Sequence, residues 1–137
     1  MFNTVLFPID RSRESREAAQ KVVELVKTFD SRLILLSVVE QPAEGQESPP
    51  GEAMMSPEAV AELLQGAKQA LAGQGIEAET MEREGQAPFV ICDVADEIAA
   101  DLIVMGCRGM GMTEEGAADS VTNRVINLSP CPVLIVT

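Results

Sequence analysis

The chain has 137 residues, with 10 Lys+Arg against 22 Asp+Glu, a formal net charge of −12, and no His, Trp or Tyr. The acidic balance disfavours nucleic acid and anionic membrane surfaces as partners, and the absence of imidazole excludes Ser-His-Asp triads, Cys-His pairs and His-ligated zinc. The length predicts a single domain over residues 1–137 whose core is large enough to fold without disulfides.

Short apolar segments predict five strands. A weaker run, Ile76–Arg83, alternates apolar and charged residues and predicts a more exposed strand. The other four segments are nearly continuous in hydrophobicity, as strands covered on both faces are: Thr4–Ile9, Leu33–Val39, Leu102–Met105 and Val133–Val136.

Helical patterns separate these strands. Residues 15–29 place apolar side chains at i, i+3 and i+4 on one stripe that faces the sheet and ends at Phe29, with Ser12 as the expected N-cap. Ser56-Pro57 begins a second helix that Gly73 ends, and Ala87-Pro88 begins a third. A last helix, from about Gly116 to Leu128, is expected to bury three apolar side chains: Val121, Val125 and Leu128.

Alternation of strands and helices predicts an α/β fold, a doubly wound five-stranded parallel sheet with helices on both faces. Gln41–Met55 is rich in Pro, Gly and Glu, and we interpret it as a mobile surface loop. Three cysteines without a CxxC motif indicate a reducing compartment, and no apolar run is long enough to span a membrane. We therefore expect a cytoplasmic protein.

Candidate binding residues follow the predicted strands, because ligands of open α/β sheets lie beyond the carboxyl ends of the strands. Asp10 follows Pro8-Ile9 and has two open interpretations: a hydrogen-bond acceptor for ribose hydroxyls or an amine, or a helix cap. Val38, at the end of the second strand, either offers its backbone to a heterocycle or belongs to the core. The segment Gly106-Cys107-Arg108-Gly109 follows the fourth strand, where glycines let backbone N–H groups approach phosphate oxygens.

The pattern Gly106-x2-Gly109-x9-Asp119-Ser120, continued by Val121-Thr122 and closed by a Pro-Cys-Pro-Val-Leu-Ile-Val segment, resembles the nucleotide motif and last strand of the universal stress protein family. Further matches lie at residues 6–12 and 100–109, so the resemblance covers the chain from end to end. The family pattern reads G-x2-G-x9-G-[S/T].

This resemblance implies a stress-response homodimer joined through the last strand, Val133–Val136, with ATP or AMP as the ligand, either alone or together with Mg²⁺. It also implies roles for individual residues at this site. Pro8, Ile9 and Asp10 would border adenine and ribose, and Val38 would offer its backbone to adenine. The remaining contacts would come from residues that line ribose and phosphates: Met105, Gly106, Arg108, Gly109, Ser120, Val121 and Thr122.

One departure from the family pattern leaves a second function open. Asp119 stands where the motif has its third glycine, and Glu114 and Glu115 precede it. A carboxylate about 4 Å from a phosphate costs about 4 kcal/mol per charge pair at an effective dielectric of 20, unless a metal or Arg108 compensates. The sequence is therefore compatible with an adenine-nucleotide sensor and with a nucleotide-independent stress or adaptor dimer.

Catalysis and metal binding receive little support from the sequence. It contains neither a P-loop Lys nor a water-positioning base, so we expect no enzyme activity beyond very slow ATP hydrolysis. The acidic residues near the glycine segment match no metal loop, and we interpret them as surface charge. Cys92 and Cys107 suggest a redox role. A free cysteine near a glycine loop is, however, usually only a small and partly buried side chain.

Overall fold

The structure is a computed structural model that describes residues 2–10, 13–40, 57–106 and 121–136. Within these ranges strands and helices alternate along the chain. In order they are β1 (Thr4–Pro8), α1 (Arg13–Phe29), β2 (Arg32–Glu40), α2 (Pro57–Ala72), β3 (Ala78–Gly85), α3 (Ala87–Glu97), β4 (Leu102–Gly106), α5 (Val121–Leu128) and β5 (Val133–Val136). The predicted α/β class is confirmed.

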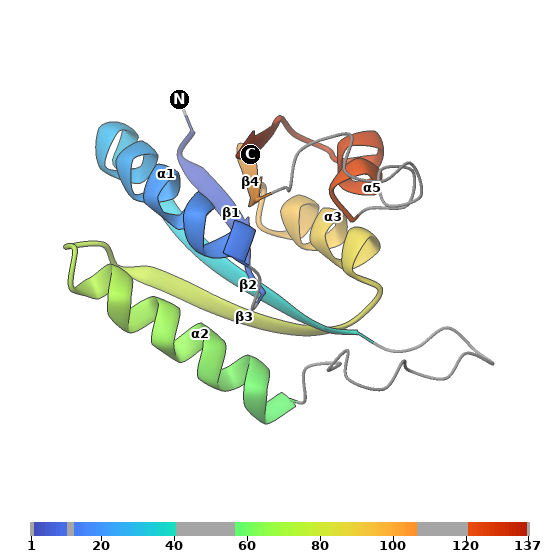
Figure 1. The fold of residues 1–137 in the computed structure, drawn as a ribbon. Helices are drawn as coiled ribbons and strands as arrows, with labels where there is room; N and C mark the ends of the chain where they lie inside the picture. The colour runs from blue at the N-terminus through green and yellow to red at the C-terminus, as the bar shows by residue number, and fades with distance from the viewer. Residues whose placement is uncertain (1, 11–12, 41–56, 107–120, 137) are drawn as a thin grey trace.

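The strands form one five-stranded sheet in the order β3-β2-β1-β4-β5, and every neighbouring pair is parallel (Figure 1). The chain first builds outward from β1 to β2 and β3, and then returns to place β4 on the other side of β1. The strand order therefore reverses between β1 and β4, which is the point where ligands bind in doubly wound sheets.

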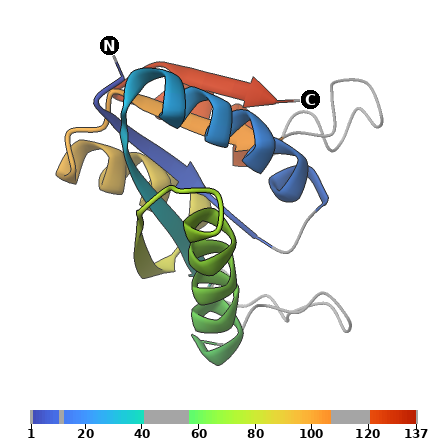
Figure 2. The ribbon, with the colours of Figure 1, turned by 90° about the vertical axis from the view of Figure 1, so that its left-hand side faces the viewer.

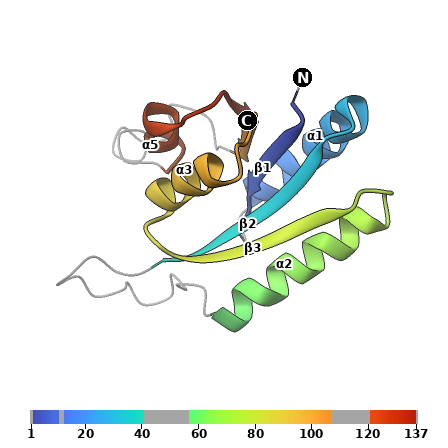
Figure 3. The same cartoon turned by 180° about the vertical axis from the view of Figure 1, so that it is seen from behind.

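Helices cover both faces of the sheet. The helices α1 and α2 lie on one face and α3 and α5 on the other, as Figures 2 and 3 show from two further directions. Successive strand residues alternate between the two cores: Val5 and Phe7 of β1 belong to the α1/α2 core, and Leu6 between them belongs to the α3/α5 core. This double coverage explains why β1, β2 and β4 are continuous in hydrophobicity.

Two apolar side chains that were predicted to face the core are instead exposed. Phe29, the last residue of α1, is 39% exposed and packs edge to face on Phe2, with ring centroids 5.2 Å apart. Leu128, the last residue of α5, is 49% exposed, whereas Val125 one turn earlier is fully buried. Both predictions were wrong for the same reason: each residue ends its helix, where there is less of the sheet or neighbouring helix to cover it.

Candidate functional site

The carboxyl ends of β1 and β4 separate at the reversal of strand order. In the described chain, β1 pairs with β4 at Val5–Leu102 and Leu6–Ile103, although β4 continues to Gly106. On its other side β1 stays paired with β2 through Pro8, and the Ile9 N–H donates a 2.8 Å hydrogen bond to the Leu36 carbonyl. The end of β1 therefore follows β2, and the residues after β1 and β4 flank the crevice position expected for this fold.

Asp10 is the first polar side chain after β1, and it is exposed. Its backbone N–H donates a 3.1 Å hydrogen bond to Oγ of Ser15, a buried residue of α1. This bond joins the turn after β1 to α1, and it holds the backbone of Asp10 next to the start of the helix. A carboxylate held at this position can accept hydrogen bonds from hydroxyl or amine groups.

Three predicted site residues lie on the α3/α5 face of the sheet. Met105 is 6% exposed and belongs to the α3/α5 core, and the partly buried Val38 and Val121 pack against that core. Ile9 lies on the opposite face, where it is 9% exposed in the α1/α2 core. The structure thus places Val38, Met105 and Val121 on the same face of the sheet and Ile9 on the other face.

The other described site residues lie at the ends of elements. Pro8 ends β1 and Gly106 ends β4, and both are partly exposed. Val121 and Thr122 are the first residues of α5 that the structure describes. Gly106 also pairs with Val136 of β5, which is an edge strand of the sheet. The candidate site at the end of β4 is therefore next to that edge strand.

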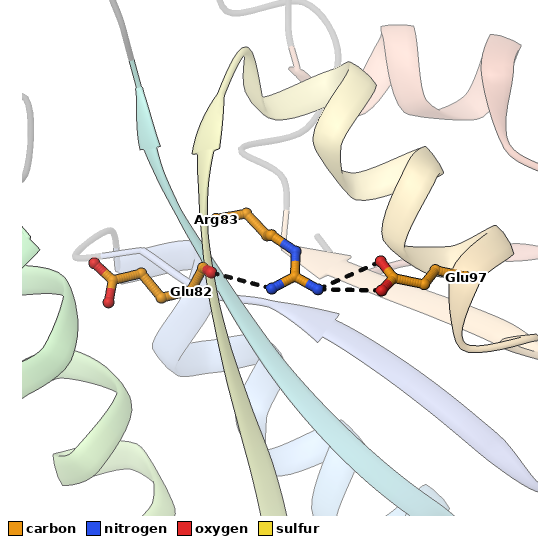
Figure 4. Close-up of polar contacts among 3 residues, drawn as sticks. All are labelled: Glu82, Arg83 and Glu97. Atoms are coloured by element: carbon orange, nitrogen blue, oxygen red, sulfur yellow. Dashed lines mark hydrogen bonds and ion pairs between the residues drawn. The ribbon is translucent and has the colours of Figure 1, made fainter.

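Arg83 is a neighbour of the site that the sequence analysis did not single out. It stands beside Val38 in the pairing of β2 with β3. One Arg83 Nη atom donates to both carboxylate oxygens of Glu97 on α3, at 3.3 and 3.4 Å, and the other donates to the Glu82 carbonyl at 3.5 Å (Figure 4). The ion pair ties the edge strand to the end of α3. The sequence pattern predicted Arg83 as the charged last residue of an alternating strand. It gave no signal that Arg83 would lie beside Val38 of β2.

Several predictions concern residues outside the described ranges. They include three proposed phosphate-binding residues, Arg108, Gly109 and Ser120, together with the carboxylates Glu114, Glu115 and Asp119, the thiol of Cys107, the caps at Ser12 and Ser56, the first part of the last helix and the loop 41–55. Within the described ranges, no group of three or more His, Cys, Asp and Glu side chains is arranged to hold a metal ion. No described helix is long and apolar enough to cross a membrane.

The universal stress protein family matches the chain over residues 1–137. Two curated relatives are the universal stress protein Sll1654 of Synechocystis, 64% identical over 99% of this chain and 86% of the relative, and YxiE of Bacillus subtilis, 33% identical over 99% of both chains. The fold and sequence together define this chain as a member of the universal stress protein family.

Solved structures of the same family share the fold. A universal stress protein crystallised in complex with cAMP aligns with a TM-score of 0.78 and 25% sequence identity, over 98% of this chain and 96% of that one.

Proposed function

We propose that this protein binds an adenine nucleotide at the carboxyl ends of β1, β2 and β4 and acts as a homodimeric stress-response sensor in the cytoplasm. The observation that carries the proposal is the separation of β1 from β4 beyond Leu6 and Ile103, with Asp10 at one side and Gly106 at the other. A family member of the same fold that binds cAMP supports an adenine nucleotide as the ligand class.

Chemistry assigns the described residues to different parts of the nucleotide. The exposed Asp10 carboxylate suits the ribose hydroxyls, and the backbone of Val38 at the end of β2 suits the edge of adenine. Met105 supplies an apolar wall, Gly106 supplies space, and Val121, the first described residue of α5, offers its backbone N–H to phosphate. Arg108, Gly109, Ser120 and Thr122 complete the proposed phosphate contacts.

A nucleotide-independent stress or adaptor dimer is the alternative function. It is favoured by Asp119, which replaces the third glycine of the family motif and adds a negative charge to a phosphate site. The two functions differ in one measurable property, the affinity for nucleotides.

Isothermal titration calorimetry with ATP, ADP, AMP and cAMP, each with and without Mg²⁺, distinguishes the two functions. The sensor function predicts heat of binding and an increase in Tm at millimolar ligand, and the absence of both with every nucleotide would establish the alternative. If the charge of Asp119 limits the affinity, Asp119→Gly should increase the affinity for ATP much more than the affinity for adenosine. Asp10→Asn is the matched variant at the sugar, and it should weaken adenosine and ATP by similar factors.

The two edges of the sheet support dimerisation through β5. The β3 edge carries charged side chains such as Glu79, Glu82 and Arg83, which discourage pairing with another strand, whereas β5 is the apolar sequence Val-Leu-Ile-Val. Leu134 on β5 is 40% exposed and lines a groove with α1 residues that include Leu25 and Phe29. An apolar edge beside a groove that is lined by apolar and charged side chains of α1 is a surface that a second copy can cover.

Light scattering tests the dimer directly. Leu134→Lys should convert a dimeric mass at micromolar concentration into a monomeric one, because a charge would be buried at the shared edge. Ile126→Lys is the matched control, since Ile126 is 52% exposed and belongs to α5 rather than to the β5 edge. A monomeric mass for the unchanged protein would contradict the proposed dimer.

We also propose that nucleotide binding is not accompanied by efficient turnover. No described residue provides a general base of the imidazole type, because the chain has no His. Phosphate release from ATP should therefore stay near the uncatalysed background, and a steady rate of several turnovers per minute would contradict the proposal.

A further inference from the structure

Two thiols from distant parts of the chain lie at the same hydrophobic core. Cys92 on α3 is 9% exposed and belongs to the α3/α5 core, and Cys131, in the link between α5 and β5, is partly buried against it. Both are free cysteines. The proposed nucleotide function uses neither of them.

The turn at the end of α5, Val125–Ser129, lies within contact distance of both sulfur atoms. Cys92 Sγ lies 4.0 Å from the Val125 carbonyl oxygen, which also accepts a 2.8 Å hydrogen bond from the Ser129 N–H. The Ser129 hydroxyl lies 3.8 Å from Cys131 Sγ and donates a 2.6 Å hydrogen bond to the Cys131 carbonyl. Both thiols therefore contact a single turn, Val125–Ser129, from the α3 side and from the β5 side.

We propose that Cys92 and Cys131 are a peroxide-dependent modification site, at which hydrogen peroxide converts the two thiols into an intrachain disulfide. Cys131 is the more exposed of the two and reacts first: its thiolate attacks one peroxide oxygen, which forms a sulfenic acid and releases hydroxide. The Cys92 thiolate then attacks the sulfenic sulfur, forms the S–S bond and expels a second hydroxide. The two protons lost by the thiols convert both hydroxides to water, so the peroxide is the two-electron oxidant.

The surroundings of the two thiols make this reaction slow at neutral pH. Burial raises the pKa of the Cys92 thiol, and the negative charge of Asp93 and the nearby Cys131 raise it further. Burial also raises the pKa of the Cys131 thiol, the hydrogen bond from Ser129 acts in the opposite direction, and Asp101 adds to the increase. Because the thiolate is the reactive form, the site responds to sustained peroxide exposure rather than to a brief pulse.

The resulting link joins α3 to the segment that leads into β5. That segment is already attached to β4 by the hydrogen bond from the Ile103 N–H to the Pro132 carbonyl, at 3.0 Å. A covalent bond at this place requires no nucleotide and no second chain. It would give a stress protein a record of oxidant exposure that is separate from nucleotide binding.

Mass spectrometry of a Cys107→Ser variant tests the proposal. This substitution is needed because trypsin leaves Cys92 and Cys107 on one peptide, residues 84–108, whereas Cys131 falls on residues 125–137. The folded variant is treated with hydrogen peroxide, and its remaining thiols are then alkylated in denaturant, where the buried Cys92 is accessible. We expect the intact mass to fall by two hydrogen atoms, no alkylation, and one linked peptide pair that dithiothreitol separates.

The matched control is the double variant Cys107→Ser/Cys131→Ser, which keeps a side chain of similar size at the more exposed of the two positions. Its circular dichroism should be unchanged, and its Cys92 should remain available for alkylation after peroxide treatment. Retention of both alkylatable thiols in Cys107→Ser, or oxidation of Cys131 to a sulfinic acid without any link to Cys92, would overturn the proposal. A link found only between two chains would overturn it as well.

Discussion

Arg32 on β2 and Glu79 on β3 form a two-pronged ion pair across the amino ends of their strands. Arg32 Nε donates to Glu79 Oε2, and Arg32 Nη2 donates to Oε1 at 2.9 Å. Both side chains are more than half exposed, so solvent screens their attraction. The parallel hydrogen bonds nevertheless fix the geometry of the pair, and the hydrogen bond from Arg32 is the main reason that the pKa of Glu79 is lowered.

Arg32→Gln should raise the pKa of Glu79 back toward its ordinary value of 4.5. A lowered pKa in the folded state contributes stability above the unfolded pKa, and this contribution is lost as the pH falls through the folded pKa. The variant should therefore lose less stability than the parent protein between neutral and acidic pH. NMR titration of the Glu79 carboxyl carbon measures the pKa, and urea unfolding at several pH values measures the stability.

Lys68→Gln is the control for this titration, because the charge of Lys68 contributes to the Glu79 pKa without a hydrogen bond. It should move the pKa of Glu79 in the same direction by a smaller amount. An effect equal to that of Arg32→Gln would show that general charge, and not the hydrogen bond, determines the shift.

The ion pair between Arg83 and Glu97 should contribute little to stability on its own. Their atoms are 3.3 Å apart, but the side chains are 41% and 59% exposed. Exposed pairs are typically worth about 0.2–1 kcal/mol and are screened by salt. A double-mutant cycle with Arg83→Met and Glu97→Gln should give a coupling free energy below about 1 kcal/mol that decreases in 1 M NaCl. A coupling that persists in high salt would indicate a role for packing of the Arg83 stem.

Long-range pairing limited what could be predicted from the sequence, whereas buried strands were readily recognised. Leu102–Met105 and Val133–Val136 were predicted within one residue of the observed strands, because double coverage demands continuous apolar sequence. Ile76 was assigned to the third strand, yet it lies before β3 and is 4% exposed. Ile76 packs its side chain in the core although its backbone lies outside the sheet. Hydrophobicity alone does not distinguish a buried residue before a strand from a residue within it.

The candidate site shows the same limit. Asp10 and Gly106 could be proposed because each follows a strand, and parallel strands place their carboxyl ends at one edge. That Ile9 and Val38 lie on opposite faces depends on the register between β1 and β2, which no local pattern encodes. Arg83 reaches Glu97 only because β3 and α3 fold back on each other.

Gly85→Ala should destabilise the protein by about 1–3 kcal/mol. Gly85 ends β3 with φ of +142°, and an added Cβ would lie 2.8 Å from Val90 Cγ2 on α3. Strain and collision act together because the turn into α3 is tight. Gly66→Ala is the matched control: this glycine is in α2 with nothing within 4 Å of an added Cβ, so alanine should stabilise by about 0.5–1 kcal/mol. Denaturant unfolding of both variants should give changes of opposite sign.

The orientation of α5 predicts that alanine substitutions at Val125 and at Leu128, about one helical turn apart, change the free energy of unfolding by very different amounts. Val125→Ala should lower the free energy of unfolding by about 1.5–3 kcal/mol, because Val125 is fully buried in the α3/α5 core. Leu128→Ala should change it by less than about 0.5 kcal/mol, because Leu128 is 49% exposed at the helix end. Chemical denaturation of both variants provides the comparison. If Leu128→Ala were the more damaging substitution in a monomeric sample, α5 would have to present a different face to α3, with Leu128 buried beside Cys92.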